Sequence, residues 1–277
     1  MTMEFKEQSI TRDFRKELWT PFLTAIREYK LISSGDHIAV CISGGKDSML
    51  LAKMMQILQR HSDTAFQLSF LAMDPGYSPQ NRERLLENAK LLQIPLVMFQ
   101  TDIFSGISQE GLRSPCYTCA KMRRGHLYKH AQTLGCNKIA LGHHFDDVIE
   151  TTVLAMFYGS QLQGMIPKLH STNFPGMELI RPLYCVREQD IIAWRDANHL
   201  SFLDCACAVA RKNQESQDGS KRQEIKQLIQ NIHKTHPAVE KCIFRSIHNV
   251  HLDTFPGYRT RGTDHSFLEN YRPPSET

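Results

Sequence analysis

Short apolar runs alternate with longer amphipathic stretches along much of this chain. The apolar runs predict buried strands at residues 37–43, 67–73, 96–100 and 138–142. The amphipathic stretches predict helices at residues 49–60, 80–92, 117–134 and 147–158. Because parallel strands are joined through crossover helices, this alternation is typical of βαβ units. It predicts an α/β fold, namely a doubly wound parallel sheet with helices on both faces.

The chain divides into three predicted parts around this sheet. Residues 1–34 are expected to form an N-terminal helical segment, and residues 35–210 the sheet domain with its paired cysteines. A further strand at 177–184 and a helix at 188–199 complete that domain. A polar stretch follows, so residues 211–277 are expected to form a small helical C-terminal extension.

Composition excludes several classes of protein. The 277 residues are enough for a core without disulfide staples, and the apolar and charged fractions of 41% and 22% are ordinary for a globular chain. A net charge of +4 permits a polyanionic partner without requiring one. No apolar run is long enough to span a bilayer, and the charged N-terminal stretch lacks the apolar core of a signal peptide. We therefore expect a cytoplasmic protein.

The segment Ser-Gly-Gly-Lys-Asp-Ser follows the first predicted strand and opens the first helix of the sheet domain. Two glycines allow close backbone approach to a ligand, and the helix start supplies N–H groups and a positive dipole end. This combination predicts a phosphate-binding loop, although it lacks the glycine spacing of a Walker A motif. The alternative is a glycine-rich turn in which Asp47 or Ser48 only caps the helix.

A second polar segment, Gly-His-His-Phe-Asp-Asp, follows the strand predicted at 138–142. Two carboxylates beside bound phosphates are suited to Mg²⁺, which takes one or two carboxylates together with phosphate oxygens. A helix cap is the alternative, so we assign Asp146 to chemistry and Asp147 to the cap or an outer shell. His143 and His144 are candidate metal ligands or packed core residues.

Four of the eight cysteines are paired, Cys116 with Cys119 and Cys205 with Cys207. The first pair is expected to open a helix whose N-terminus and neighbouring basic residues favour thiolates. Such pairs in a cytosolic chain indicate metal or redox chemistry. We order the alternatives as an iron–sulfur cluster, a structural zinc site and a redox pair.

The motifs together resemble one known family. The loop sequence resembles the pyrophosphate (PP) loop of the ATP pyrophosphatases, and GHHFDDVIET, MFYG and RPL resemble the tRNA 2-thiocytidine synthetases. The resemblance covers roughly residues 35–207. It implies an ATP site, whose expected residues are Ser43, Gly44, Gly45, Lys46, Asp47, Ser48, Asp74, Gly142 and His143.

In that family a C-x-x-C pair and one later cysteine hold a four-iron four-sulfur cluster, which leaves one iron open. The resemblance therefore implies Cys116, Cys119 and Cys205 as cluster ligands. This chain departs from the family by carrying Cys-Ala-Cys at the third ligand, and the preceding Phe-Leu-Asp favours Cys205 over Cys207. The basic run after the first pair implies tRNA binding by Lys121, Arg123 and Arg124.

The reaction implied is ATP-dependent thiolation of a tRNA cytidine. The C2 oxygen would be adenylated and then replaced by sulfur, with catalytic roles for Lys46, Asp146, Cys116 and Cys119. ATP, Mg²⁺ and the cluster are the expected cofactors, and tRNA and a sulfur donor, either a cysteine desulfurase or sulfide, are the expected partners. A persulfide on one cysteine is the alternative nucleophile. The resemblance also suggests a homodimer.

Two classes of function compete with this interpretation. One is a related PP-loop enzyme, either a 2-thiouridine synthetase or a lysidine-type ligase. The other is a non-enzymatic zinc protein that binds RNA, which would leave the phosphate loop without a purpose. Release of pyrophosphate from ATP distinguishes an enzyme from a binding protein.

Overall fold

A computed structural model describes residues 7–101, 115–203 and 217–271, and for 115–121 and 217–220 it describes the backbone only. The chain forms two compact units, Met1–Leu228 and Ile229–Thr277. Among the helices of these described ranges, none combines the length and apolar character needed to cross a membrane.

The first unit contains a mostly parallel sheet. In the described residues its strands are β1 (His37–Ile42), β2 (Gln67–Asp74), β3 (Leu96–Gln100), β4 (Lys138–Ala140), β5 (Lys168–His170) and β6 (Glu178–Ile180). Their order is β3-β2-β1-β4-β6-β5, and every neighbouring pair is parallel except β5 with β6. The predicted α/β fold is confirmed.

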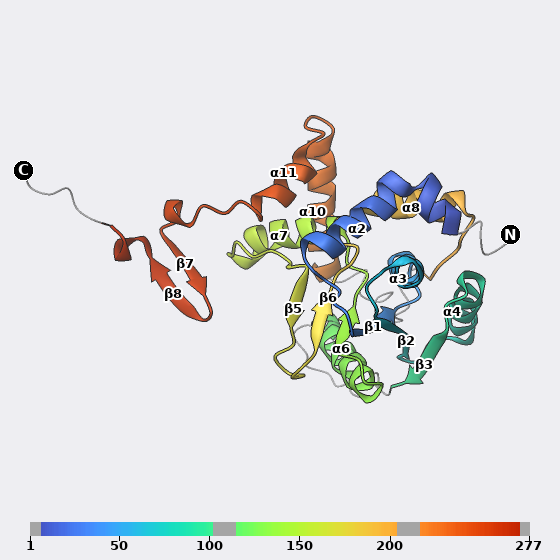
Figure 1. Ribbon diagram of the computed structural model, residues 1–277. Helices are drawn as coiled ribbons and strands as arrows, with labels where there is room; N and C mark the ends of the chain where they lie inside the picture. Colours follow the sequence, from blue (N-terminus) through green and yellow to red (C-terminus); the bar gives the residue numbers. More distant parts are fainter. Residues whose placement is uncertain (1–6, 102–114, 204–216, 272–277) are drawn as a thin grey trace, which may run out of the picture. The chain divides into compact units, whose positions relative to one another are not determined.

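Helices cover both faces of this sheet. The helices in the described part of this unit are α2 (Thr20–Glu28), α3 (Lys46–His61), α4 (Pro79–Leu92), α6 (Pro115–Thr133), α7 (Phe145–Gly159), α8 (Glu188–Ala197) and α10 (Gln217–His233), the last of which continues past the unit's end at Leu228. Helix α3 packs on β1 and β2, and α6 packs on β2 and β4, on opposite sides of the sheet (Figure 1). The core between the sheet and α6 includes Ala39, Leu71 and Ile139, which are fully buried.

The N-terminal segment is helical, as expected, and begins with two π-helical turns at Ser9–Asp13 and Arg15–Trp19. It is held to the first unit by buried polar contacts. Lys53 in α3 contacts Glu7 at 2.9 Å, and the Asn198 amide donates to the Ser9 hydroxyl at 2.9 Å.

The structure differs from the predicted strands near the β5 edge of the sheet. The strand expected at 177–184 ends at Ile180. The Arg181 carbonyl accepts a hydrogen bond from the Tyr184 N–H, which closes a turn, and Pro182 has no N–H to donate to a neighbouring strand. Strand β5 was not predicted, because it has only three residues, all at least partly exposed. The sheet therefore gains an antiparallel edge strand.

The second unit contains α11 (Val239–Ser246) and a hairpin of β7 (Gly257–Thr260) and β8 (Thr263–Ser266). The hairpin turns at Arg261 and Gly262, whose φ angles of 49° and 83° are those of a type I′ turn. We expected helix and loop here. Strands β7 and β8 are polar and lack alternating apolar residues, so their sequences do not predict strands. Only the turn residues could have indicated a hairpin.

Candidate functional site

The loop between β1 and α3 has the geometry of an anion-binding turn. Gly44 has a φ of +88°, which favours glycine, and Gly45 occupies the N-cap of α3 with no side-chain cap bond. The Ser48 hydroxyl accepts from the Ser43 N–H at 3.1 Å and donates to the Gly45 carbonyl at 2.9 Å, which fixes the turn. A helix that begins this way presents N–H groups and a positive dipole end to a ligand.

Gly142 brings the end of β4 against this loop. A Cβ atom at position 142 would lie 3.1 Å from the Ser48 nitrogen and 3.2 Å from the Asp47 carbonyl carbon. Only glycine allows this approach of the two backbones. The carboxyl ends of β1 and β4, where open parallel sheets bind ligands, therefore form one site.

The end of β2 adds a polar pocket on the other side of the loop. Asp74 accepts from the N–H groups of Gly76 and Tyr77 at 2.9 and 2.8 Å, and the Tyr77 hydroxyl donates to the Ser43 carbonyl at 3.4 Å. The pocket has a volume of about 460 Å³ and is lined by Asp74, Gly76, Tyr77, Arg82, Gln100 and Thr101. It joins the phosphate-binding loop through Tyr77, so nucleotide-sized space adjoins that loop.

Asp147 closes a capping box at the start of α7. Its carboxylate accepts from the His144 N–H at 3.0 Å, while the His144 Nδ1 accepts from the Asp147 N–H at 3.4 Å. The expectation that Asp147 caps this helix is confirmed. His144 is buried at the N-cap.

Asp146, the neighbouring carboxylate, joins α7 to the start of α8. Its Oδ2 accepts from the Glu188 N–H at 2.6 Å, and its Oδ1 lies 3.3 Å from the Arg187 Nε. The side chain is 16% exposed, so both contacts are partly shielded from water. Within the described residues no group of three or more His, Cys, Asp or Glu side chains is gathered as a preformed metal site.

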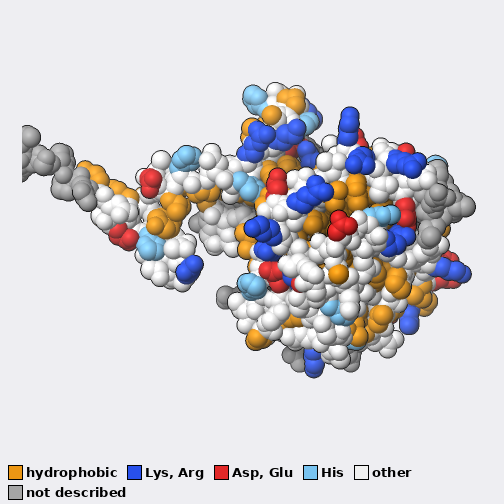
Figure 2. All heavy atoms as spheres, viewed as in Figure 1, with side chains coloured by type: hydrophobic (Ala, Val, Ile, Leu, Met, Phe, Trp, Pro, Cys, Tyr) orange, Lys and Arg blue, Asp and Glu red, His pale blue; other side chains and the backbone are white. Residues whose placement is uncertain are grey.

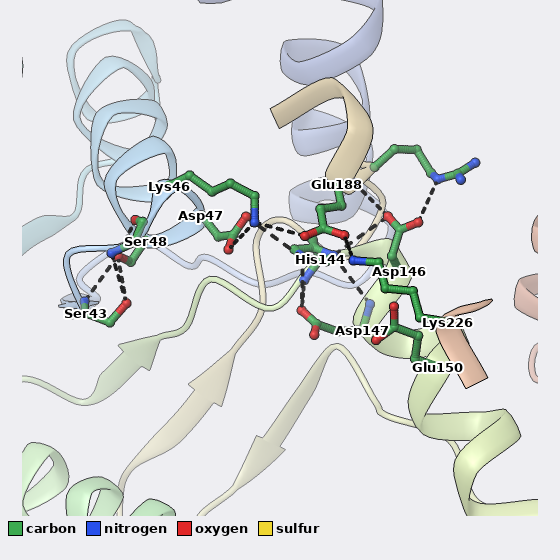
Figure 3. Close-up of polar contacts among 12 residues, drawn as sticks. Ser43, Lys46, Asp47, Ser48, His144, Asp146, Asp147, Glu150, Glu188 and Lys226 are labelled. Carbon is green, nitrogen blue, oxygen red and sulfur yellow. Dashed lines mark hydrogen bonds and ion pairs between the residues drawn. The ribbon is translucent and has the colours of Figure 1, made fainter. Parts of the chain in front are cut away.

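A network of ion pairs extends from the loop to α8 and α10 (Figure 3). The Lys46 ammonium contacts Asp47 at 3.2 Å and Glu188 at 3.0 Å, and the second oxygen of Glu188 contacts Lys226 at 2.5 Å. Arg222, one turn earlier on α10, contacts both Asp147 and Glu150, at 2.6 and 3.0 Å. Helix α10 thus contributes two cations, Arg222 and Lys226, to the carboxylates of α7 and α8.

Burial and these pairs shift several pKa values. Burial alone would raise the pKa of Glu188, but hydrogen bonds from Lys226 and Lys46 lower it to about 2. Burial raises the pKa of Asp47, and its Oδ1 has no hydrogen-bond partner in the described part of the chain. Burial also lowers the pKa of His143 to about 4, so its imidazole is neutral at pH 7.

The sequence analysis missed Glu188 and Lys226 as site residues. Lys46 and Glu188 are 142 positions apart, and no motif connects them. Arg222 was visible only as part of a basic pair with Lys221. Ion pairs among the helices α3, α7, α8 and α10 identify Glu188, Arg222 and Lys226.

The structure covers part of the predicted cysteine cluster. Cys116 and Cys119 lie at the start of α6, which begins at Pro115, two residues earlier than predicted. Their side chains and that of Lys121, and the whole of Cys205 and Cys207, lie outside the described residues.

The two described basic side chains after the first cysteine pair differ in exposure. Arg123 is partly buried and Arg124 is exposed. On the face shown in Figure 2, Lys and Arg side chains of the larger unit are interspersed with Asp and Glu. Their assignment to tRNA binding stays a prediction.

Comparison with known proteins defines the class. Residues 17–212 match the PP-loop domain family. Together with the glycine loop at the carboxyl ends of a parallel sheet, this match makes the chain a PP-loop protein, and the predicted ATP pyrophosphatase-type fold is confirmed.

Two relatives that match most of this chain identify the family more closely. A tRNA-cytidine(32) 2-sulfurtransferase from Citrifermentans bemidjiense is 35% identical over 232 residues, 82% of this chain and 88% of the relative. One from Vibrio vulnificus is 37% identical over 241 residues, 83% of this chain and 74% of the relative. The chain belongs to the family of tRNA-cytidine(32) 2-sulfurtransferases, which confirms the resemblance found in its motifs.

A solved structure shares the fold. The U34-tRNA thiolase NcsA from Methanococcus maripaludis, determined with its 4Fe–4S cluster, superposes with a TM-score of 0.65 at 18% identity, covering 84% of this chain and 80% of that one. At this identity the likeness concerns the fold.

Proposed function

We propose that this protein catalyses ATP-dependent thiolation of tRNA, replacing the C2 oxygen of the cytidine at position 32 with sulfur. The observation that carries this proposal is the identity of 35–37% to tRNA-cytidine(32) 2-sulfurtransferases over more than four fifths of the chain. The phosphate-binding loop and the polar pocket beside it provide the ATP site that such a reaction needs.

The first half of the reaction activates the base. The C2 oxygen attacks the α-phosphorus of ATP, and pyrophosphate leaves. The N–H groups at the start of α3 and the Lys46 ammonium stabilise the negative charge on the phosphates. The second half replaces the oxygen, because sulfide adds at C2 and AMP leaves with that oxygen. Cytidine, ATP and sulfide thus give 2-thiocytidine, AMP and pyrophosphate.

The carboxylates around the loop fit Mg²⁺. Asp47 has a buried oxygen without a hydrogen-bond partner among the described residues, and Asp146 lies at the adjacent strand end. Carboxylate oxygens together with phosphate oxygens are the usual ligands of this ion. Mg²⁺ bound there would neutralise part of the triphosphate charge.

The paired cysteines fit an iron–sulfur cluster by the chemistry of their donor atoms. Cys116, Cys119 and Cys205 supply three thiolates, fewer than the four that close a site completely. A cluster bound by three thiolates would supply an open iron for the sulfide. The fold that this chain shares with a thiolase solved with its cluster is compatible with that arrangement.

Further parts of the proposal concern partners. Lys121, Arg123 and Arg124 follow the first cysteine pair and would bind the tRNA backbone, which carries a negative charge at every phosphate. The sulfur comes from a cysteine desulfurase or from sulfide. We also propose a cytoplasmic homodimer.

The loop is tested by replacing Gly45 with valine. A Cβ at this position lies 3.6 Å or more from the nearest protein atoms, and the φ of −77° is accessible to valine, so the fold is expected to persist. The branched side chain blocks phosphate approach, so ATP affinity should fall at least roughly tenfold. Isothermal titration calorimetry with circular dichroism as the folding control measures this. Unchanged ATP affinity would remove the loop from the site.

The whole reaction is tested with anaerobically prepared protein, ATP, Mg²⁺, sulfide and an unmodified tRNA transcript carrying cytidine at position 32. We expect 2-thiocytidine on mass spectrometry of the digested tRNA, with one AMP released per thiolated base. A transcript with uridine at position 32 serves as the control and should stay unmodified. Thiolation of uridine instead would favour a thiouridine synthetase, and the absence of pyrophosphate release would favour a binding protein.

A further inference from the structure

Helix α10 carries a lysine that shares a carboxylate with the loop lysine. The two oxygens of Glu188 contact different ammonium groups, Oε1 with Lys46 at 3.0 Å and Oε2 with Lys226 at 2.5 Å. Figure 3 shows Lys46 reaching from the start of α3, and Lys226 from α10, to opposite ends of this carboxylate. Two ammonium groups are thereby held next to each other beside the phosphate-binding loop.

Glu188 and Asp47 together balance the charges of the two ammonium groups. An anion would therefore bind through N–H donors and not through an excess of positive charge. Each ammonium group has three donors, of which these ion pairs use two on Lys46 and one on Lys226. Lys46 has a second carboxylate partner in Asp47, at 3.2 Å. The side chain of Lys226 is 34% exposed, so an incoming anion has access to it.

Two further contacts fix the position of α10 against the first unit. Arg222 contacts Asp147 and Glu150 at once, and Ile225 is 1% exposed. Arg222 and Lys226 are four positions apart and therefore share one face of the helix with Ile225. This anchoring holds Lys226 at the site. Lys226 therefore loses less side-chain entropy on binding a ligand than a mobile surface lysine would.

We propose that Lys226 is a second phosphate-binding lysine, which acts with Lys46 on the β- and γ-phosphates of ATP and on the departing pyrophosphate. Glu188 is a positioning residue that holds the two ammonium groups side by side. The inference rests on the proposed function, since it assigns a further residue to the ATP site of that reaction.

The test compares ATP and AMP binding by full-length holoprotein carrying Lys226→Gln. Because AMP lacks the β- and γ-phosphates, we expect ATP affinity to fall at least roughly tenfold while AMP affinity stays unchanged. Lys226→Arg keeps the charge and should recover most of the ATP affinity. Lys221→Gln is the matched control on the same helix, because the Lys221 ammonium lies over the Tyr158 ring at 5.4 Å, away from Glu188.

Four outcomes overturn the inference. Equal losses of ATP and AMP affinity would assign Lys226 only to holding α10 in place. Unchanged ATP affinity with weaker tRNA binding would assign the lysine to the RNA backbone. If Lys226→Gln fails to fold, Lys226→Arg is compared with Lys226→Met instead. The inference fails if Lys226→Arg does not bind ATP more tightly than Lys226→Met. A wild-type chain that binds no ATP overturns the proposed function as well, which separates the two failures.

Discussion

Replacing Cys116 or Cys119 by serine is expected to remove bound iron and 2-thiocytidine formation together, while ATP binding is retained. A serine hydroxyl is a poor iron ligand compared with a thiolate, so loss of one of three ligands should release the cluster. ATP binds through the loop at Ser43–Ser48, which these substitutions leave intact. Iron, acid-labile sulfide and thiolated nucleoside are measured on anaerobically purified protein, and ATP affinity by calorimetry.

The third ligand distinguishes a cluster from a structural zinc site. We expect Cys205→Ser to behave like the first two variants and Cys207→Ser to keep its iron. Cys242→Ser is the control, because that thiol is free and exposed in the second unit. If Cys205 and Cys207 are equally required, four thiolates close the site and zinc becomes the better account. Stoichiometric zinc, without iron before or after reconstitution, would contradict sulfur transfer through a cluster.

Strands β1 and β2 at the centre of the sheet were predictable because most of their residues are buried. The strand at 67–73 reads as a short apolar run bounded by polar residues, and the structure places β2 at Gln67–Asp74 with five consecutive buried residues. The edge strand β5 had no such signal, because an edge strand packs on one neighbour and its three residues are not fully buried. The other edge strand, β3, was predicted at 96–100 because it contains the apolar run Leu-Val-Met-Phe. A strand therefore escapes prediction when it is short and lacks an apolar run.

The site was predictable only where its contacts are local in sequence. His144 and Asp147 form their capping box three positions apart, a spacing that can be read directly. Glu188 is adjacent to the loop lysine only because α8 packs against α3, and 142 residues separate the two. A single sequence contains no signal for that contact, since each residue by itself resembles an ordinary surface charge.

The role of Asp146 depends both on its local position in the sequence and on contacts with residues far along the chain. Its position at a strand end predicts a metal ligand, but the structure also gives it hydrogen bonds to Glu188 and Arg187 that hold α8 in place. A loss of activity on substitution would therefore have two explanations, chemistry or a displaced helix. The choice of control variant decides between them.

Asp146→Asn is expected to lose AMP transfer by at least roughly a hundredfold while the protein stays folded, because removing charge stabilisation from phosphates costs about this much. The asparagine oxygen still accepts from the Glu188 N–H, so the free energy of unfolding should fall only by the contribution of the partly exposed Arg187 pair, about 1 kcal/mol.

Arg187→Gln is the control, since it breaks the same pair from the other side and leaves the carboxylate in place. Pyrophosphate release and thermal unfolding are measured for both variants, with and without Mg²⁺. If the two variants lose equal activity, Asp146 acts only as a tether between α7 and α8. Stability does not decide, because Arg187→Gln also removes the guanidinium from the Phe145 ring, whose centroid lies 4.9 Å away. If Asp146→Asn alone loses activity, and its residual rate no longer depends on Mg²⁺ concentration, the carboxylate acts through the metal.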